Sequence, residues 1–131
     1  MRVPFRFIGR TSLGQIWRPY VVVNALTRDG SEWIPIEMIV DTGADYTLLP
    51  KRYADIIGID VNVDCRPETT VGVGGVETVH LYESLRLKVG KWESRVPMGF
   101  LERHDVPALM GRLGCIEAMR VCFGKRVVSF E

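Results

Sequence analysis

The chain has 131 residues, of which 47% are hydrophobic and 25% are charged, a balance that excludes disorder, collagen-like repeats and a transmembrane protein. Seventeen Lys and Arg residues stand against 16 Asp and Glu residues, so the net charge of +1 gives no basic excess for a nucleic-acid partner. The length predicts one domain that spans residues 1–131.

The three cysteines, Cys65, Cys115 and Cys122, form no CxxC pair and are odd in number, which predicts free thiols in a reducing compartment. We expect Cys115 and Cys122 to pack as small buried hydrophobic residues rather than to act as nucleophiles. The N-terminus is too charged for a secretory signal, and no stretch reaches the roughly 18 apolar residues of a membrane span. We therefore expect a cytoplasmic protein with no membrane partner.

Short β-rich runs separated by turn residues fill most of the sequence and predict a mainly β fold. Residues 18–26 and 32–40 flank an Asp-Gly loop and predict a first hairpin. Pro35 lies within the second of these runs and indicates an edge strand or a bulge. Residues 51–57 predict two helical turns, which begin near Pro50 and stop at Gly58.

Two further hairpins are predicted in the second half of the chain. Residues 85–89 and 92–97 form one, with its turn at Gly90-Lys91, and residues 120–123 and 126–130 form the other, with its turn at Gly124-Lys125. Between the two hairpins, the spacing of Leu113, Ile116 and Met119 predicts a helix over residues 113–119.

The strongest functional signal is Asp41-Thr42-Gly43, which directly follows an apolar strand. A carboxylate at such a strand end lies where the chain leaves the core and can face a cleft. Taken alone, Asp-Thr-Gly is also an ordinary turn, because Asp and Gly are common turn residues. Its context favours a functional interpretation, since Leu48-Leu49-Pro50, a glycine-rich stretch at 71–75 and Leu109-Met110-Gly111-Arg112 follow in that order.

Three blocks, residues 39–45, 71–75 and 108–112, together resemble the retropepsin-like aspartic proteases, which include retroviral proteases and similar bacterial proteins. The resemblance implies a single-domain closed β-barrel with one short C-terminal helix. It also implies a flap hairpin whose Val73 amide reaches the substrate through a water, and an Arg112 that supports the site by pairing with Asp45. The implied catalytic residues are Asp41, Thr42 and Gly43, with Thr42 bonding across a twofold axis, and the implied substrate-binding residues are Ala44, Asp45, Gly72, Val73, Gly74, Gly75 and Leu109.

The chemistry of peptide hydrolysis determines how many copies of the chain one active site needs. One carboxylate takes a proton from water while a second carboxylic acid polarises the scissile carbonyl, and two such groups at close range share a single proton. This chain carries one Asp-Thr-Gly, so the second Asp41 must come from another copy, which predicts a homodimer that acts on polypeptides. Water is the nucleophile, so no cofactor is expected, and His80 and His104 lack the partners of a metal site.

The sequence alone leaves alternatives open. The glycine-rich stretch could be a nucleotide-binding loop only with a helix after it, whereas residues 76–82 look like a strand. The chain could also be a catalytically inactive or latent member of the same fold that serves as a dimerisation or peptide-binding module. Leu48 and Leu109 could line apolar subsites or belong to the core.

The sequence departs from the retroviral pattern at several points. Tyr46 replaces a second acid, and Leu113 follows Arg112 where Asn or Asp is common. A whole hairpin over residues 120–130 replaces a single terminal strand, so the retroviral interface woven from both termini need not be reproduced. Ala44 lacks the hydroxyl that pepsin-like relatives carry, which predicts activity at weakly acidic or near-neutral pH.

Overall fold

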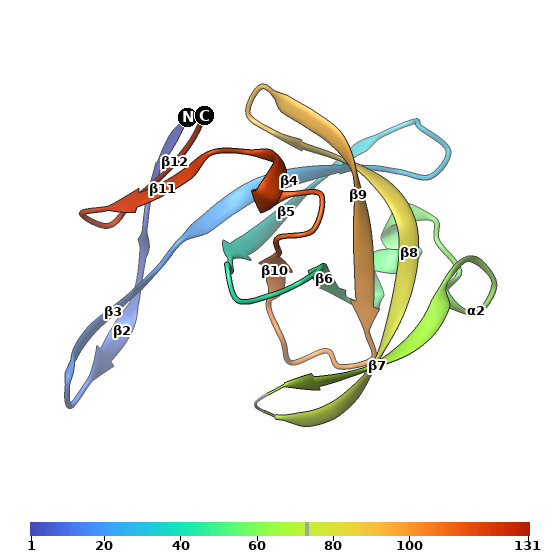
Figure 1. Ribbon diagram of the computed structural model, residues 1–131, viewed down its shortest axis with the longest axis horizontal. Coiled ribbons are helices and arrows are strands. Elements are labelled where there is room, and N and C mark those ends of the chain that lie inside the picture. The colour runs from blue at the N-terminus through green and yellow to red at the C-terminus, as the bar shows by residue number, and fades with distance from the viewer. Residues whose placement is uncertain (73) are drawn as a thin grey trace.

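The computed structural model describes residues 1–72 and 74–131 and confirms that the chain is mainly β (Figure 1). The strands are β1 (Arg2–Pro4), β2 (Arg6–Thr11), β3 (Gly14–Arg18), β4 (Tyr20–Leu26), β5 (Trp33–Val40), β6 (Thr47–Pro50), β7 (Arg66–Gly72), β8 (Gly75–Val89), β9 (Trp92–Leu101), β10 (Ala108–Met110), β11 (Val121–Gly124) and β12 (Val127–Phe130). The helical segments are α1 (Arg52–Ile57), α2 (Val61–Asp64) and the 3₁₀ helix η1 (Ile116–Ala118).

A seven-stranded sheet with the order β4-β5-β10-β6-β9-β8-β7 forms the body of the molecule. Strand β4 also pairs with β8, through Asn24 opposite Lys88 and Ala25 opposite Leu87, so the sheet curls until distant strands meet. Two smaller sheets, β1-β12-β11 and β2-β3, lie on one side of this body (Figure 1).

The alternation of side chains along β4 and β5 explains why these strands border the core. Their buried faces consist of Val21, Val23, Ala25, Ile36, Met38 and Val40. Strand β10 pairs with β5 only at Met38–Val40, so Pro35 lies where β5 pairs with β4 alone. The predicted edge position of Pro35 is therefore confirmed.

The helices match the prediction in part. Helix α1 is confirmed, and it ends at Gly58, whose φ of +92° suits glycine and whose N–H donates to the carbonyl of Ala54 at 2.9 Å. The predicted helix over 113–119 is wrong, because Gly114 has a φ of +64° and Cys115 has φ −125° and ψ −89°. Only the three residues of η1 remain helical there. None of the described helices is long and apolar enough to cross a membrane.

The predicted hairpins are present, with one correction. Strands β8 and β9 turn after Val89, and the φ of Gly90 is +56°. In the last hairpin the turn residues are Lys125 and Arg126, with φ values of +50° and +60°, while Gly124 belongs to β11. Positive φ at both central residues is the requirement of a two-residue hairpin turn, and here two non-glycine residues meet it.

The two chain termini pair with each other. Strand β12 lies between β1 and β11, with Val3 opposite Val128 and Phe123 opposite the same residue on the other side. The cysteines are free thiols, and Cys115 is buried as expected. The expectation for Cys122 is wrong, because its side chain is exposed on β11.

Candidate active site

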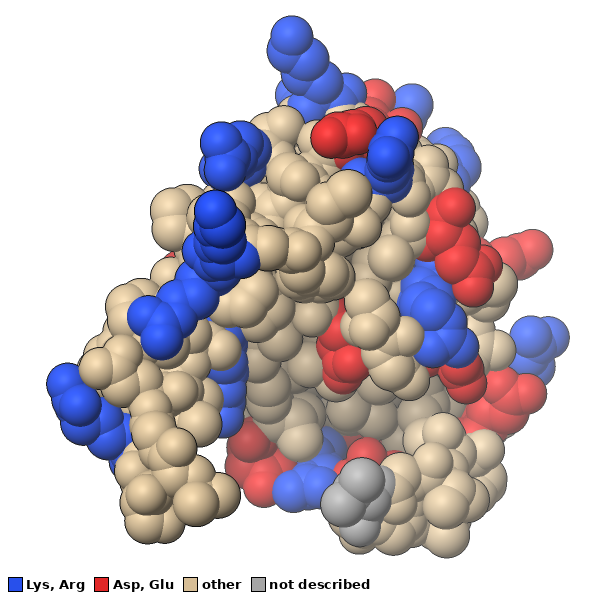
Figure 2. Space-filling model, turned by 60° about the vertical axis from the view of Figure 1, so that its left-hand side comes forward, with Lys and Arg blue, Asp and Glu red and all other residues tan. Residues whose placement is uncertain are grey.

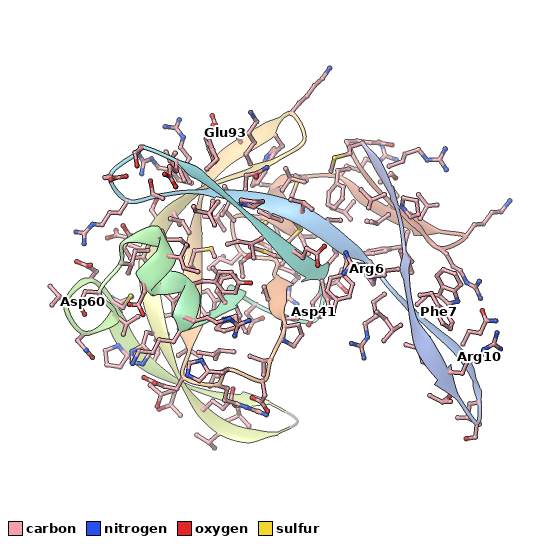
Figure 3. All side chains as sticks on the ribbon, turned by 180° about the vertical axis from the view of Figure 1, so that it is seen from behind. Arg6, Phe7, Arg10, Asp41, Asp60 and Glu93 are labelled. Atoms are coloured by element: carbon pink, nitrogen blue, oxygen red, sulfur yellow. The ribbon has the colours of Figure 1, made fainter. Side chains whose placement is uncertain are left out.

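Asp41 follows the last residue of β5 and is half-buried (Figure 3). Its backbone N–H donates to the carbonyl of Met110 at 2.9 Å, which continues the parallel pairing of β5 with β10. Two buried neighbouring strands therefore fix the position from which the Asp41 side chain leaves the core.

The turn after Asp41 orients its carboxylate. The N–H of Gly43 donates to Asp41 Oδ1 at 2.9 Å, and the N–H of Ala44 donates to the Asp41 carbonyl at 3.2 Å. A Cβ on Gly43 would lie 3.2 Å from the same Oδ1, a tight contact that glycine avoids. Thr42 lies between Asp41 and Gly43 in the sequence, next to the candidate carboxylate, and is exposed.

Arg112 holds this loop from the other side. Its Nη1 donates to the carbonyl of Thr42 at 2.6 Å and its Nη2 donates to Asp45 Oδ1 at 2.5 Å. Its backbone N–H also donates to the carbonyl of Ala44 at 2.9 Å. The pair of Asp45 with Arg112 that the resemblance implied is thus present, and three hydrogen bonds from one residue span the loop.

Gly111 makes the close approach of these two segments possible. A Cβ at this position would lie 2.1 Å from the carbonyl oxygen of Tyr46, a distance that no side chain tolerates. The N–H of Gly111 donates to the hydroxyl of Thr47 at 3.1 Å. Thr47 is the only fully buried polar residue in the described part of the chain, and it is not among the site residues predicted from the sequence. Its one signal is a hydroxyl at the head of the apolar run Leu48-Leu49-Pro50.

Leu48 and Leu109 face each other across the antiparallel pair of β6 and β10, and both are half-buried. Leu109 also lies opposite Ile39 in β5, two residues before Asp41. Both leucines therefore pack partly on the core and expose apolar surface next to the loop that carries Asp41.

The hairpin of β7 and β8 contains the residues that are predicted to form a flap. Residues 75–78 of β8 pair with β7 alone, because the pairing of β8 with β9 begins at Val79, so the tip extends beyond the sheet. Val71 is 78% exposed and Val76 is 69% exposed on this extension. Gly72 lies opposite Gly75, and Gly75 has a φ of +108° that favours glycine. Val73 lies outside the described residues.

An ion-pair cluster links the flap to the loop between β9 and β10. Arg103 pairs with Glu77 of the flap at 3.0 Å and with Asp105 at 2.7 Å. Arg103 Nη1 would also lie 3.5 Å from a Cβ on Gly74. The Arg103 hydrogen bonds lower the pKa of the Asp105 carboxyl. Because the same loop leads into β10, the flap and Leu109 are connected through one short segment.

A pocket of about 490 Å³ opens beside the loop, and it is lined by Tyr46, Asp64, Cys65, Arg66, Leu81, Tyr82, Glu83, Pro97, Met98 and Leu113. Asp41 is not among these lining residues. Figure 2, in which the side of β2 and β3 is turned forward, shows a surface that is hollowed, with acidic side chains in the hollow. No group of three or more residues suited to hold a metal ion occurs in the described part of the chain.

The comparisons with known proteins bear on this arrangement. The family model described as "gag-polyprotein putative aspartyl protease" matches residues 32–112, more than half of the chain. The match begins one residue before β5 and ends on Arg112, so it contains the Asp41 loop, the β7–β8 hairpin and the Gly111-Arg112 segment. No curated protein matches the chain.

Proposed function

The chain belongs to the gag-polyprotein aspartyl protease family, which is retropepsin-like, and from that premise we propose that it is an aspartic endopeptidase that acts as a homodimer. The proposed active site forms at a twofold axis from the Asp41 of each copy, and it hydrolyses peptide bonds with water as the nucleophile, without a cofactor.

The observation that carries this proposal is the setting of Asp41. The carboxylate stands at the end of a buried strand, and a backbone N–H binds one of its oxygens. Hydrolysis through water requires two carboxyls that share one proton, and each chain supplies one Asp-Thr-Gly. Asp41 lines no part of the pocket beside its loop, so the walls of a complete cleft are expected to come from a second copy.

The neighbouring residues receive roles that fit their contacts. Thr42 is exposed, and we assign its hydroxyl to a hydrogen bond across the twofold axis that keeps the two loops in register. The flap closes over the substrate and excludes bulk water. The proposed substrate contacts are Ala44, Asp45, Gly72, Val73, Gly74, Gly75 and Leu109.

The same proposal covers the form of the domain. The pairing of β4 with β8 supports a closed barrel, and residues 1–131 are taken as one domain. The free thiols of Cys65, Cys115 and Cys122 support a cytoplasmic location.

A peptide-library digest of the purified chain tests the proposal, with mass spectrometry of the products. Asp41→Asn is the informative variant, because Asn keeps an oxygen that accepts from the Gly43 N–H but cannot serve as the base. We expect cleavage by the wild type, a loss of at least 1000-fold in Asp41→Asn, and inhibition by a transition-state analogue of aspartic proteases.

Asp55→Asn is the matched control, since Asp55 is exposed on α1 and lies outside the proposed site. Excess Asp41→Asn subunits should also lower the activity of the wild type by forming mixed dimers. Retained cleavage by pure Asp41→Asn would refute the mechanism. A dimer that binds peptides but cleaves none would instead favour the binding module.

A further inference from the structure

Strands β2 and β3 form a hairpin that stands apart from the rest of the molecule; residues 6–18 are called the arm below. They make a two-stranded sheet of their own, from Arg6 opposite Arg18 to Thr11 opposite Gly14. Figure 1 shows the arm projecting away from the body on the side of the termini. A two-stranded hairpin is only marginally stable in water by itself, so this projection needs contacts beyond its own hydrogen bonds.

The base of the arm is anchored, and its direction is therefore fixed. Arg6 donates two hydrogen bonds to Glu37 of β5, at 3.0 and 2.7 Å, and its guanidinium lies 4.4 Å from the ring centre of Tyr20. Trp17 packs edge-on against Phe7 at 5.2 Å, and Arg126 of the terminal sheet lies 4.5 Å from the Trp17 ring. These contacts hold the arm outward from the body.

The surface of the arm is apolar beyond what a solvated hairpin requires. Leu13 at the tip is 97% exposed, Phe7 is 44% exposed, Ile8 is 41% exposed and Ile16 is 37% exposed. Large apolar side chains that gather on one projecting element mark an interaction surface. An aliphatic tip is suited to bury against another protein.

The base of the arm, where β3 ends, lies beside the loop that carries Asp41. The N–H of Val40, the residue before Asp41, donates to the carbonyl of Pro19, the residue after the arm, at 2.9 Å. Figure 3 shows the same relationship, with Asp41 at the end of β5 and Arg6, Phe7 and Arg10 following one another along the arm. Six residues of extended strand reach about 20 Å from that point. A second copy that brings its own Asp41 to this loop lies within reach of the arm.

The terminal strands pair with each other within one chain, so they do not explain how two copies associate. Strand β12 has β1 on one edge and β11 on the other, and the N-terminal amine donates to the Phe130 carbonyl at 3.0 Å. Both edges of β12 are therefore paired within one chain and are not available to a strand from a second copy. The dimer needs another element, and the arm stands next to the place where the two copies must meet.

Charge also favours a second copy as the occupant. The arm carries Arg6, Arg10 and Arg18 and no acidic residue, so the rest of the chain holds 14 of the 17 basic residues against all 16 acidic ones. The arm thus has a net charge of +3 and the rest of the chain, with 14 basic and 16 acidic residues, a net charge of −2, so the arm of one copy and the body of another attract each other.

We propose that the arm is a dimerisation element that lies against the body of a second copy of this chain and holds the two Asp41 loops together. This inference rests on the proposed function, because the need for a second copy at Asp41 comes from it. It adds the surface through which the copies associate, which the sequence motifs do not indicate.

Sedimentation velocity over a dilution series tests the inference with two charge substitutions at exposed apolar positions. Leu13→Glu removes the apolar tip of the arm, whereas Val63→Glu alters a 77% exposed residue on α2, on the opposite side of the body (Figure 1). We expect Leu13→Glu to raise the dimer dissociation constant at least tenfold and Val63→Glu to leave it unchanged, with the circular dichroism of both variants equal to the wild type. A photo-cross-linker at position 13 should join two copies of the chain.

The outcomes separate this inference from the proposed function. An equal dissociation constant in wild type and Leu13→Glu, or a wild type that stays monomeric at 100 μM, overturns the inference that the arm mediates dimerisation. This holds whether or not the chain cleaves peptides. A dimer that depends on the arm but cleaves no peptide supports the role of the arm in dimerisation and refutes the proposed protease activity. If Leu13→Glu loses cleavage of long substrates alone and keeps its dimer, the arm binds substrate and the inference is wrong.

Discussion

Arg112 donates a hydrogen bond of 2.6 Å to the backbone carbonyl of Thr42, across 70 positions of sequence. The contact ties the segment after β10 to the loop that carries Asp41. Because the acceptor is a backbone atom, the bond constrains the path of the loop itself. The second bond of Arg112, to Asp45, extends the same constraint by three residues.

Arg112→Ala is expected to lower kcat/KM at least tenfold while costing little stability. The side chain of Asp45 is 78% exposed, and exposed ion pairs contribute only about 0–1 kcal/mol. A misplacement of a catalytic group by about 1 Å can cost roughly 100-fold in rate, so position is the larger effect. Arg112→Lys, which retains the charge but not the two-pronged geometry, should fall between wild type and Arg112→Ala.

The control for this prediction is Arg86→Ala, which removes a surface ion pair to Glu93 at 3.8 Å, on the hairpin of β8 and β9. Its kcat/KM and thermal midpoint should match the wild type. Wild-type kcat/KM in Arg112→Ala would contradict the positioning role.

Gly111→Ala is expected to destabilise the chain by about 1–3 kcal/mol, the usual cost of a forced backbone shift in a packed region. The added Cβ would lie 2.1 Å from the Tyr46 carbonyl oxygen, and one of the two backbones must move. Urea unfolding measures the change. Gly124→Ala is the control, because nothing lies within 4 Å of a Cβ there, and a loss as large as that of Gly111→Ala would refute the clash.

The parts of the fold that follow local rules could be predicted from the sequence. The strand before Asp41 shows clear alternation, and Gly58 ends α1 with the positive φ that its position suggests. The position of Asp41 at a strand end follows from the same pattern. The pairing of Asp45 with Arg112 came from the family resemblance, since nothing in the local sequence links residues 67 positions apart.

Other parts depend on three-dimensional contacts or on irregular backbone. The strands of the arm were not predicted because their register shifts between Phe7 and Gly9. The shift breaks the alternation of side chains, with a period of two residues, by which a strand is recognised in a sequence. The contact between Gly111 and Tyr46 arises only when the sheet is assembled. The helix over 113–119 had the right spacing of apolar residues, but the positive φ of Gly114 ended it.

Arg103→Ala is expected to loosen the flap. The tip of β8 pairs with β7 alone, so the bond from Arg103 to Glu77 at 3.0 Å is a main link to the loop after β9. Amide hydrogen exchange should accelerate in residues 69–72 and 75–78, with a three- to tenfold fall in kcat/KM. Arg95→Ala, an exposed position on β9, should change neither, and unchanged exchange in Arg103→Ala would show that the flap is held by its strands alone.

Stability should depend on the Cys115 thiol at high pH. Burial raises the pKa of this thiol to about 11 from its ordinary value of 9.0. Between these values the unfolded thiol has lost its proton and the folded one has not, so the free energy of unfolding falls as the pH rises above 9. Urea unfolding from pH 7 to 10 should show a steeper fall in the wild type than in Cys115→Ala, and equal slopes would contradict the prediction. Cys122→Ala, at an exposed position, should keep the wild-type slope.

Ala44→Ser is expected to move the pH dependence of activity downward. Ala44 lies in the same turn as Asp41, since its N–H donates to the Asp41 carbonyl at 3.2 Å. A serine hydroxyl there can donate a hydrogen bond to the catalytic carboxylates and favour their charged form. In the proposed mechanism activity requires the singly protonated pair, so a more readily ionised pair would reach that state at lower pH, and the profile would belong to the pair as a whole. The measurement is kcat/KM against pH with one peptide for wild type, Ala44→Ser and the exposed control Ala118→Ser. The control should match the wild type, and an unshifted or upward-shifted profile for Ala44→Ser would show that residue 44 does not reach the carboxylates.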